Sequence, residues 1–328
     1  MASSEPLHRG RAASGRFEIP LAAVAAAAAF SALFVIPLFG ALGVPLAAIP
    51  VVRLAHRRGL AVALVACAGA VGIVLGTAWA AAGLGTAVAM AFVAAGATAI
   101  PVASVGFLRA GAEASRCYLG IGLAGCAFLA AGFVASTTSP GPSVAAEVGV
   151  VFDQMIPSAL ESYSRSGADA ETVARMRQTL EAARDFSRQY LWGIFGALWM
   201  LGGAVAFYGG AAASRPAPTA IAARFDDLRV PASAAALFVA AGAGFGLLPG
   251  EGRRVAGNLL LPLVALFFVA GLSIICHFFR RWIRVRVLRA GLYALAAYFP
   301  INIGVVLLGL FDWYVDFRRR GEGVIEKS

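Results

Sequence analysis

Polar side chains within long apolar stretches are the residues of this sequence best placed to do chemistry. Asn258, Asn302 and Asp312 lie in or at the end of such stretches. Polar groups at membrane depth are costly to bury and often mark solute or ion pathways. We therefore predict that these three residues line one outward-facing ligand pocket. The alternative is that each side chain joins two helices or caps a helix end.

Signatures of catalysis and of metal binding are missing from the sequence. It contains no P-loop, no Gly-x-Ser-x-Gly and no His-Glu-x-x-His motif. The four cysteines include no Cys-x-x-Cys pair. Gly120-x-Gly122-x-x-Gly125 matches a dinucleotide fingerprint but lies inside an apolar stretch, where close helix packing is the better interpretation. We expect no catalytic residues, no metal and no cofactor, and hence a protein that is not an enzyme.

Basic residues occur mainly in short segments between the apolar stretches, and the net charge is +10. A nucleic-acid role would need a basic face with stacking aromatic residues, and the sequence shows none. The densest basic segment contains Arg280, Arg281, Arg284, Arg286 and Arg289. This segment is predicted to contact anionic lipids or to dock a cytoplasmic protein partner.

Long stretches without Asp, Glu, Lys or Arg determine the class of protein. They cover residues 19–52, 59–108, 117–146, 189–214, 230–250, 255–279 and 290–311. A helix crosses a bilayer with about 20 mainly apolar residues. The pattern therefore predicts an all-α, polytopic bundle of nine membrane helices, or eight if residues 39–52 do not cross. The stretch 59–108 is expected to hold two spans that turn near Gly83–Gly85, and the last stretch is expected to form one span.

Charge distribution divides the chain further. Residues 1–18 are predicted to be a disordered cytoplasmic N-terminus, 19–137 and 190–317 to hold the membrane helices, and 318–328 to form a polar tail. With the N-terminus inside, the short basic segments fall on the cytoplasmic side, as the positive-inside rule requires. In the nine-helix arrangement, the arginines at 318–320 are the exception, because they fall outside.

Residues 138–189 differ from the rest because they are rich in charged side chains of both signs. We predict an extracytoplasmic insert of two amphipathic helices that are separated around Ser164–Ala168. In the second helix, apolar residues recur every three or four positions from Val173 to Phe186, which gives one apolar face. Asp169 or Ser166 is the expected cap of this helix.

Several segments resemble a known family. They are Asn258–Pro262 with Gly271, Gly309–Arg318, and Phe225-x-x-Leu-Arg-Val-Pro231. Together they are similar to the YybS-like family of uncharacterised bacterial membrane proteins, over roughly residues 20–320. Near the Gly271 position, where the family has a glutamine, this sequence has Ala270. The resemblance implies an all-helical protein of the bacterial plasma (inner) membrane, without an established activity. Such families look distantly similar to the substrate-binding components of energy-coupling-factor vitamin transporters and to a small cell-shape membrane protein.

Three functions remain open from the sequence. The first is a solute-binding component of a transporter without its own ATPase, with residues 138–188 as a lid and an energising partner at the basic segments. The second is a membrane scaffold or regulator that acts through protein contacts. The third, an enzyme acting on lipid, is the weakest because no cluster of catalytic polar residues is visible.

Overall fold

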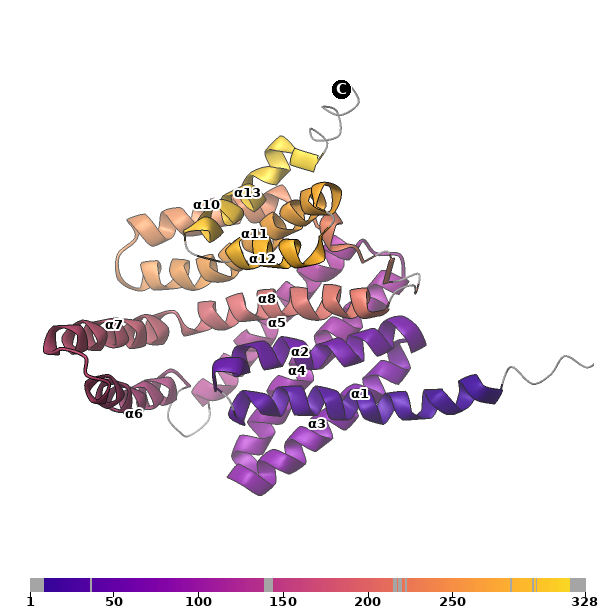
Figure 1. Ribbon diagram of the computed structural model, residues 1–328, viewed down its shortest axis with the longest axis horizontal. Helices are drawn as coiled ribbons and strands as arrows, with labels where there is room; N and C mark the ends of the chain where they lie inside the picture. Colours follow the sequence, from indigo (N-terminus) through magenta and orange to yellow (C-terminus); the bar gives the residue numbers. More distant parts are fainter. Residues whose placement is uncertain are drawn as a thin grey trace, which may run out of the picture. The chain divides into compact units, whose positions relative to one another are not determined.

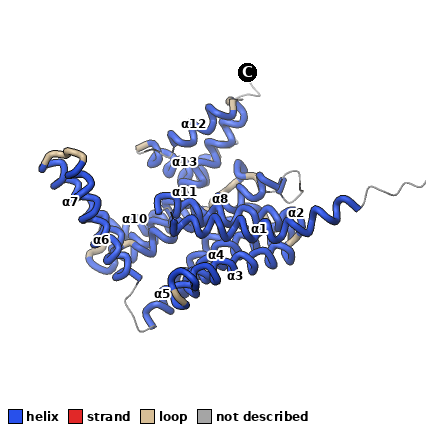
Figure 2. Tube along the Cα trace, turned by 60° about the horizontal axis from the view of Figure 1, so that its bottom comes forward, coloured by secondary structure: helices blue, strands red, loops and turns tan. Residues whose placement is uncertain are grey.

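Helices account for all the regular structure in the described residues. The computed structural model describes residues 9–35, 37–138, 144–214, 217, 220–221, 223–283, 285–296, 298 and 300–318. Twelve α-helices and one short 3₁₀-helix, η1 (Phe225–Asp227), lie within these residues (Figure 1; Figure 2). The all-α prediction is confirmed for this part of the chain.

The chain folds into two compact units. Unit 1 comprises residues 1–125, 198–232 and 265–328, and unit 2 comprises residues 126–197 and 233–264. Three long helices contribute residues to both units: α5 (Ala114–Thr138), α8 (Leu191–Ser214) and α11 (Gly250–Trp282).

The first four helices pack together within unit 1. They are α1 (Arg9–Val35), α2 (Pro37–Arg58), α3 (Leu60–Ala82) and α4 (Leu84–Arg109). Gly83 alone joins α3 to α4, with a φ of +84° that favours glycine, and this turn falls where the sequence predicted it. α1 begins at Arg9, inside the segment predicted to be disordered. The arginine and alanine residues there have high helix propensity and extend the apolar helix.

Within the described residues, five helices are long and apolar enough to cross a membrane. The qualifying stretches are Leu60–Ala81, Met90–Arg109, Ala114–Ala131, Leu191–Ser214 and Gly250–Trp282. Shorter apolar stretches occur in α1, in α10 (Ala232–Leu247) and in α13 (Ile301–Val315). The structure thus agrees with a membrane protein of several apolar helices, whereas the total of eight or nine spans stays a prediction.

The structure divides the span predicted over residues 290–311. α12 (Arg286–Ala296) ends before Pro300, and α13 starts directly after it. Proline lacks a backbone N–H, and it disfavours helical geometry in the preceding residue. The helix therefore restarts at this point.

α13 packs closely on α11 through two glycines of unit 1. The Cα of Gly309 lies against the carbonyl of Phe267, and that of Gly271 lies against the carbonyl of Val305. A Cβ at either glycine would overlap main-chain atoms of the other helix. Contact between small residues is the usual way in which helices approach closely in membranes.

Unit 2 contains the helical insert. α6 (Val144–Arg165) and α7 (Ala170–Gln189) occupy the two helical stretches that the sequence predicted, and they pack on each other. Arg184 of α7 forms an ion pair with Asp153 of α6, with an Nη1–Oδ1 distance of 2.9 Å. Asp169 caps α7 by accepting a hydrogen bond from the backbone N–H of Thr172. Of the two predicted caps, Asp169 therefore fills the role.

Candidate functional site

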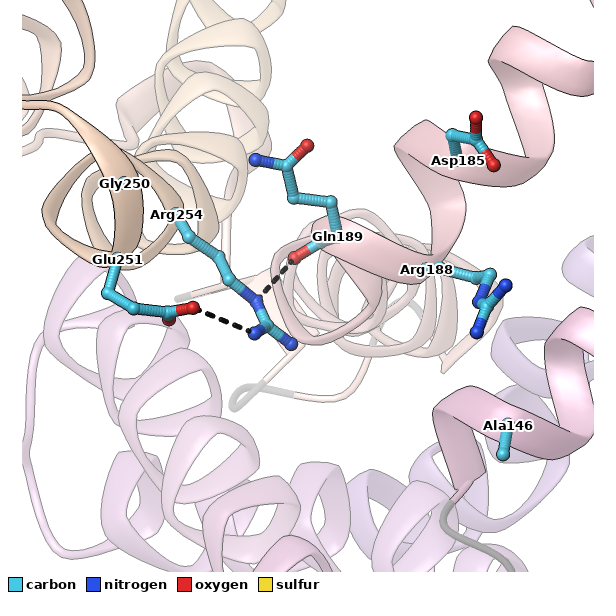
Figure 3. Close-up of a pocket in the computed structure, with 7 residues that line it drawn as sticks. All are labelled: Ala146, Asp185, Arg188, Gln189, Gly250, Glu251 and Arg254. Atoms are coloured by element: carbon cyan, nitrogen blue, oxygen red, sulfur yellow. Dashed lines mark hydrogen bonds and ion pairs between the residues drawn. The ribbon is translucent and has the colours of Figure 1, made fainter.

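A charged cavity of about 540 Å³ that is wide open to solvent lies at the surface of unit 2, between the end of α7, the start of α11 and the start of α6 (Figure 3). Its lining residues are Ala146, Asp185, Arg188, Gln189, Gly250, Glu251 and Arg254. This volume falls within the range of small-molecule sites, about 300–1,000 Å³. Unlike typical drug sites, the cavity has charged side chains of both signs.

Helix periodicity positions the four charged side chains. Asp185 and Arg188 are three residues apart on α7, and Glu251 and Arg254 have the same spacing on α11, so each pair shares one helix face. Figure 3 shows Arg254 extending from α11 towards the main chain of Gln189, and Arg188 extending to the side on which Ala146 lies. The cavity is therefore walled by the insert on one side and by α11 on the other.

The four charged side chains of the cavity remain exposed to solvent in spite of the contacts that they make. Arg254 lies 3.4 Å from Glu251 through Nη1, and its Nε donates to the carbonyl of Gln189 at the same distance. Asp185 accepts a hydrogen bond from Arg184 at 3.1 Å. Arg188 is exposed as well. Exposed ion pairs of this kind contribute only about 0–1 kcal/mol to stability, so these groups are available to a ligand at little cost.

Helix dipoles add to the charges of the cavity. The carboxyl end of α7 carries a partial negative charge, and the amino end of α11 carries a partial positive charge. The guanidinium groups of Arg188 and Arg254 suit a carboxylate or phosphate, whereas Asp185 and Glu251 suit an ammonium group. The cavity has the chemistry to bind an amphoteric solute. No group of three or more His, Cys, Asp or Glu residues suited to a metal ion occurs in the described part of the chain.

Asn258 lies beside this cavity and joins three helices of unit 2. Its Oδ1 accepts a hydrogen bond from the backbone N–H of Gly193 at 2.7 Å. Its Nδ2 donates to the carbonyls of Gln189 at 3.1 Å and Arg254 at 2.9 Å. Asn258 therefore makes the helix-joining contacts of the alternative interpretation, and it fixes the two residues that meet across the cavity.

Asn302 and Asp312 both lie on α13 in unit 1. Asp312 is mostly buried, with its Oδ2 3.6 Å from Nη1 of Arg318. The Oδ1 of Asn302 is buried and has no hydrogen-bond partner among the described residues. Since Asn258 belongs to unit 2, the single pocket predicted for the three residues stays a prediction.

Arg318 is buried in unit 1, although the sequence placed it in a polar tail. Only 7% of its side chain is exposed. Its Nη2 donates hydrogen bonds to the carbonyl of Leu228 at 2.9 Å and to Oγ of Ser273 at 2.7 Å. Together with Asp312, these residues form what we call the Arg318 cluster. Sequence reasoning missed this cluster; the signal that could have found it was an arginine six residues after Asp312, the aspartate that follows an apolar stretch of the sequence.

Asp226 in η1 is a second buried charge that sequence reasoning missed. It is 3% exposed and accepts hydrogen bonds from Arg224 at 2.8 Å and Arg280 at 2.7 Å. Burial by itself raises the pKa of the Asp226 carboxyl, but the two guanidinium groups outweigh burial and hold the pKa at about 2. Arg280, predicted to meet lipid or a partner, thus forms an ion pair within the protein.

The structure describes the other four arginines of the segment 280–289 to different extents. Arg281 is exposed. Arg286 and Arg289 lie on α12, but their side chains are outside the described part, and Arg284 is outside it altogether. Their predicted contacts with lipid or with a partner therefore stay predictions.

Most of the chain matches a known protein family. The family described as "Predicted membrane protein (DUF2232)" matches residues 23–313. The comparisons with curated proteins and with solved structures found no significant match.

Proposed function

This chain belongs to the predicted membrane protein family DUF2232, and we propose that it is the solute-binding membrane component of a transporter that lacks its own ATPase. The charged cavity between the insert and α11 carries the proposal. The absence of a P-loop from the sequence supports a separate energising protein. The YybS-like group is the finer placement that we propose within the family, on the motifs Asn258–Pro262 and Gly309–Arg318.

The class of solute follows from the lining of the cavity. Two guanidinium groups and two carboxylates face one space of about 540 Å³, which suits a small amphoteric molecule such as an amino acid or a short peptide. The proposed lid is the insert, since α7 and the start of α6 contribute to the lining. Closure of the insert over a bound solute would remove water and strengthen each charged contact.

The proposed orientation places the cavity outside the cell. We propose eight spans in a bacterial plasma (inner) membrane, with a cytoplasmic N-terminus. The five long apolar helices and the shorter apolar stretches of α1 and α10 support seven of these spans, and α2 is the proposed eighth. The basic segments support the orientation. Exposed arginines such as Arg53, Arg57 and Arg281 would then face the cytoplasm, where they would meet anionic lipids and the energising or regulatory partner.

A membrane scaffold or regulator is the second candidate, and one observation favours it. α6 exposes Val150, Val151 and Met155, each more than half accessible. Apolar side chains clustered on an extramembrane helix often mark a protein-binding surface. In this alternative, the insert captures another protein rather than covering a solute.

Native mass spectrometry of the protein, gently extracted from its own membrane, tests the proposal. We expect a small amphoteric molecule to stay bound, and to be lost when Arg188→Ala and Arg254→Ala are combined. Arg177→Ala is the matched control, because Arg177 is on α7 but does not line the cavity.

Two results would contradict the proposal. Retention of the small molecule by the double variant would place the solute elsewhere. Co-purification of another protein without any small molecule would favour the scaffold.

A further inference from the structure

We infer that α12 and α13 form a re-entrant hairpin, which places the C-terminal end of the chain on the same side of the membrane as the basic segments around Arg58, Arg109 and Arg229. The inference concerns unit 1 alone and does not depend on the proposed function. It follows from contacts that join segments far apart in the sequence.

Four contacts first bring the early basic segments to one end of unit 1. Glu18, the tenth residue of α1, pairs with Arg58 at the end of α2, at 3.0 Å. Arg109, at the end of α4, donates to the carbonyl of His56 at 3.0 Å. The remaining two contacts are Ser214 Oγ to the carbonyl of Arg53 at 3.3 Å, and the N–H of Arg229 to Ser115 Oγ at 2.9 Å. The ends of α2, α4 and α8 and the start of α5 therefore gather around one end of unit 1, together with the part of α1 that contains Glu18.

The segment 224–229 then links this end to the end of α11. Arg280, in the last turn of α11, donates to Asp226 at 2.7 Å. The N–H of Arg229, three residues later, is bonded to Ser115 at the start of α5. α11 therefore ends where the other basic segments gather.

The chain after α13 returns to the same segment. Arg318 donates to the carbonyl of Leu228, and Asp316 lies 3.6 Å from Arg229. Arg318 also bonds Ser273 of α11, which at 1.5 Å per residue lies only about 10 Å along the helix from Arg280. Both the start of α12 and the end of α13 are thereby near the end of α11.

Helix lengths agree with a return rather than a crossing. At 1.5 Å per residue, α12 is about 16 Å long and α13 about 22 Å long, and each is shorter than the hydrocarbon core of about 30 Å. Pro300 separates the two helices, so they do not form one continuous span. Membranes tolerate a break of this kind where protein covers it, and α13 is covered by α11 at Gly309 and Val305.

A re-entrant hairpin also removes the exception in the charge pattern. Residues 318–320 are all arginine, and a crossing α12–α13 segment would place them opposite the other basic segments. With the hairpin, this triplet joins them, as the positive-inside rule requires. Arg318 is the residue that fastens the returning chain, because its side chain is buried against Leu228 and Ser273.

Cysteine labelling in closed membrane vesicles tests the inference. A variant in which the four native cysteines are replaced receives a single cysteine by Glu113→Cys, Ser166→Cys or Lys327→Cys, and is exposed to a membrane-impermeant maleimide from one side. We expect Lys327→Cys and Glu113→Cys to be labelled from the same side; Ser166→Cys reports the side of the insert, on which the inference does not depend. Labelling of Lys327→Cys from the side opposite to Glu113→Cys would overturn the inference.

Fusions to the otherwise unchanged chain keep the test decisive if the cysteine-free variant does not fold. A fluorescent protein and an alkaline phosphatase are fused in turn after Ser328 and, as a reference, within the 109–116 segment. We expect the same reporter to be active at both positions. Activity of opposite reporters at the two positions would overturn the inference.

Discussion

The cavity of unit 2 and the buried charges of unit 1 both bring arginines and acidic residues together, but in different surroundings. Within the cavity, the side chains of Glu251 and Arg254 are 80% and 45% exposed and lie 3.4 Å apart. In unit 1, Asp226 and Arg318 are almost completely buried and hydrogen-bonded. A buried charge requires a partner from the protein itself, whereas an exposed pair can exchange its partner for a ligand. The same residue types therefore fix structure in one unit and offer a binding surface in the other.

The largest expected effect tests the structural role of Arg318. Arg318→Met would leave Asp312 buried without its countercharge, and we expect the free energy of unfolding in detergent to fall by about 3 kcal/mol. The control, Arg177→Met on the exposed surface of α7, should change it by less than about 0.5 kcal/mol. Equal losses in both variants would remove the difference between buried and exposed arginines.

Helix packing in unit 1 should give the next largest effect. Gly309→Ala would place a methyl group on the carbonyl of Phe267, and we expect a loss of about 1–3 kcal/mol from overpacking. Gly304→Ala on the same helix is the matched control, because a Cβ there meets no atom within 4 Å. Unfolding of both variants in detergent measures the difference. A loss in Gly304→Ala as large as that in Gly309→Ala would show that helix contact is not the cause.

Asp226 should contribute stability that depends on pH. Its folded pKa of about 2 lies below the ordinary value of about 3.9, so its contribution is fully present above about pH 4 and is lost as the pH falls towards 2. Asp226→Asn should cost about 1–2 kcal/mol near neutral pH through weaker hydrogen bonds to Arg224 and Arg280. Thermal unfolding from pH 6 to pH 2 should show the wild type approaching the variant, and a constant difference would contradict the assignment.

The smallest expected effect belongs to the cavity. Asp185→Ala and Arg188→Ala should each change the free energy of unfolding by less than about 0.5 kcal/mol, because both side chains are exposed. The same unfolding measurement in detergent tests this. A loss comparable to that of Arg318→Met would make the cavity residues structural and would weaken their assignment to a solute.

Elements with local signals were predictable from the sequence. Gly83 marked the turn between α3 and α4, and Asp169 marked the start of α7. Pro300 was visible as well, but proline alone does not decide where a helix breaks: Pro20, Pro101, Pro157 and Pro262 all lie inside helices. Whether a proline interrupts a membrane helix depends on what can satisfy the freed carbonyl groups, which is a property of neighbouring helices.

Among the candidate site residues, the sequence indicated which polar groups are unusual but not which groups they meet. Asn258 was singled out from the sequence as a polar residue within an apolar segment, but its partners were not. Its partners, Gly193 and Gln189, lie more than sixty residues away in the chain. The cavity itself was not foreseen. It forms where the last residues of α7 and the first residues of α11 come together, and neither of these segments has a recognisable sequence motif.

The sequence by itself determined the helical class, the membrane location of the apolar stretches and the two-helix insert. The hydrophobicity and the length of a helix both depend on residues that are neighbours in the chain. Only the tertiary structure decided which charges are buried and paired. Arg280 and Asp226 are 54 positions apart, and Arg318 and Leu228 are 90 positions apart. The burial that makes such a charge depend on its partner exists only once distant helices have packed.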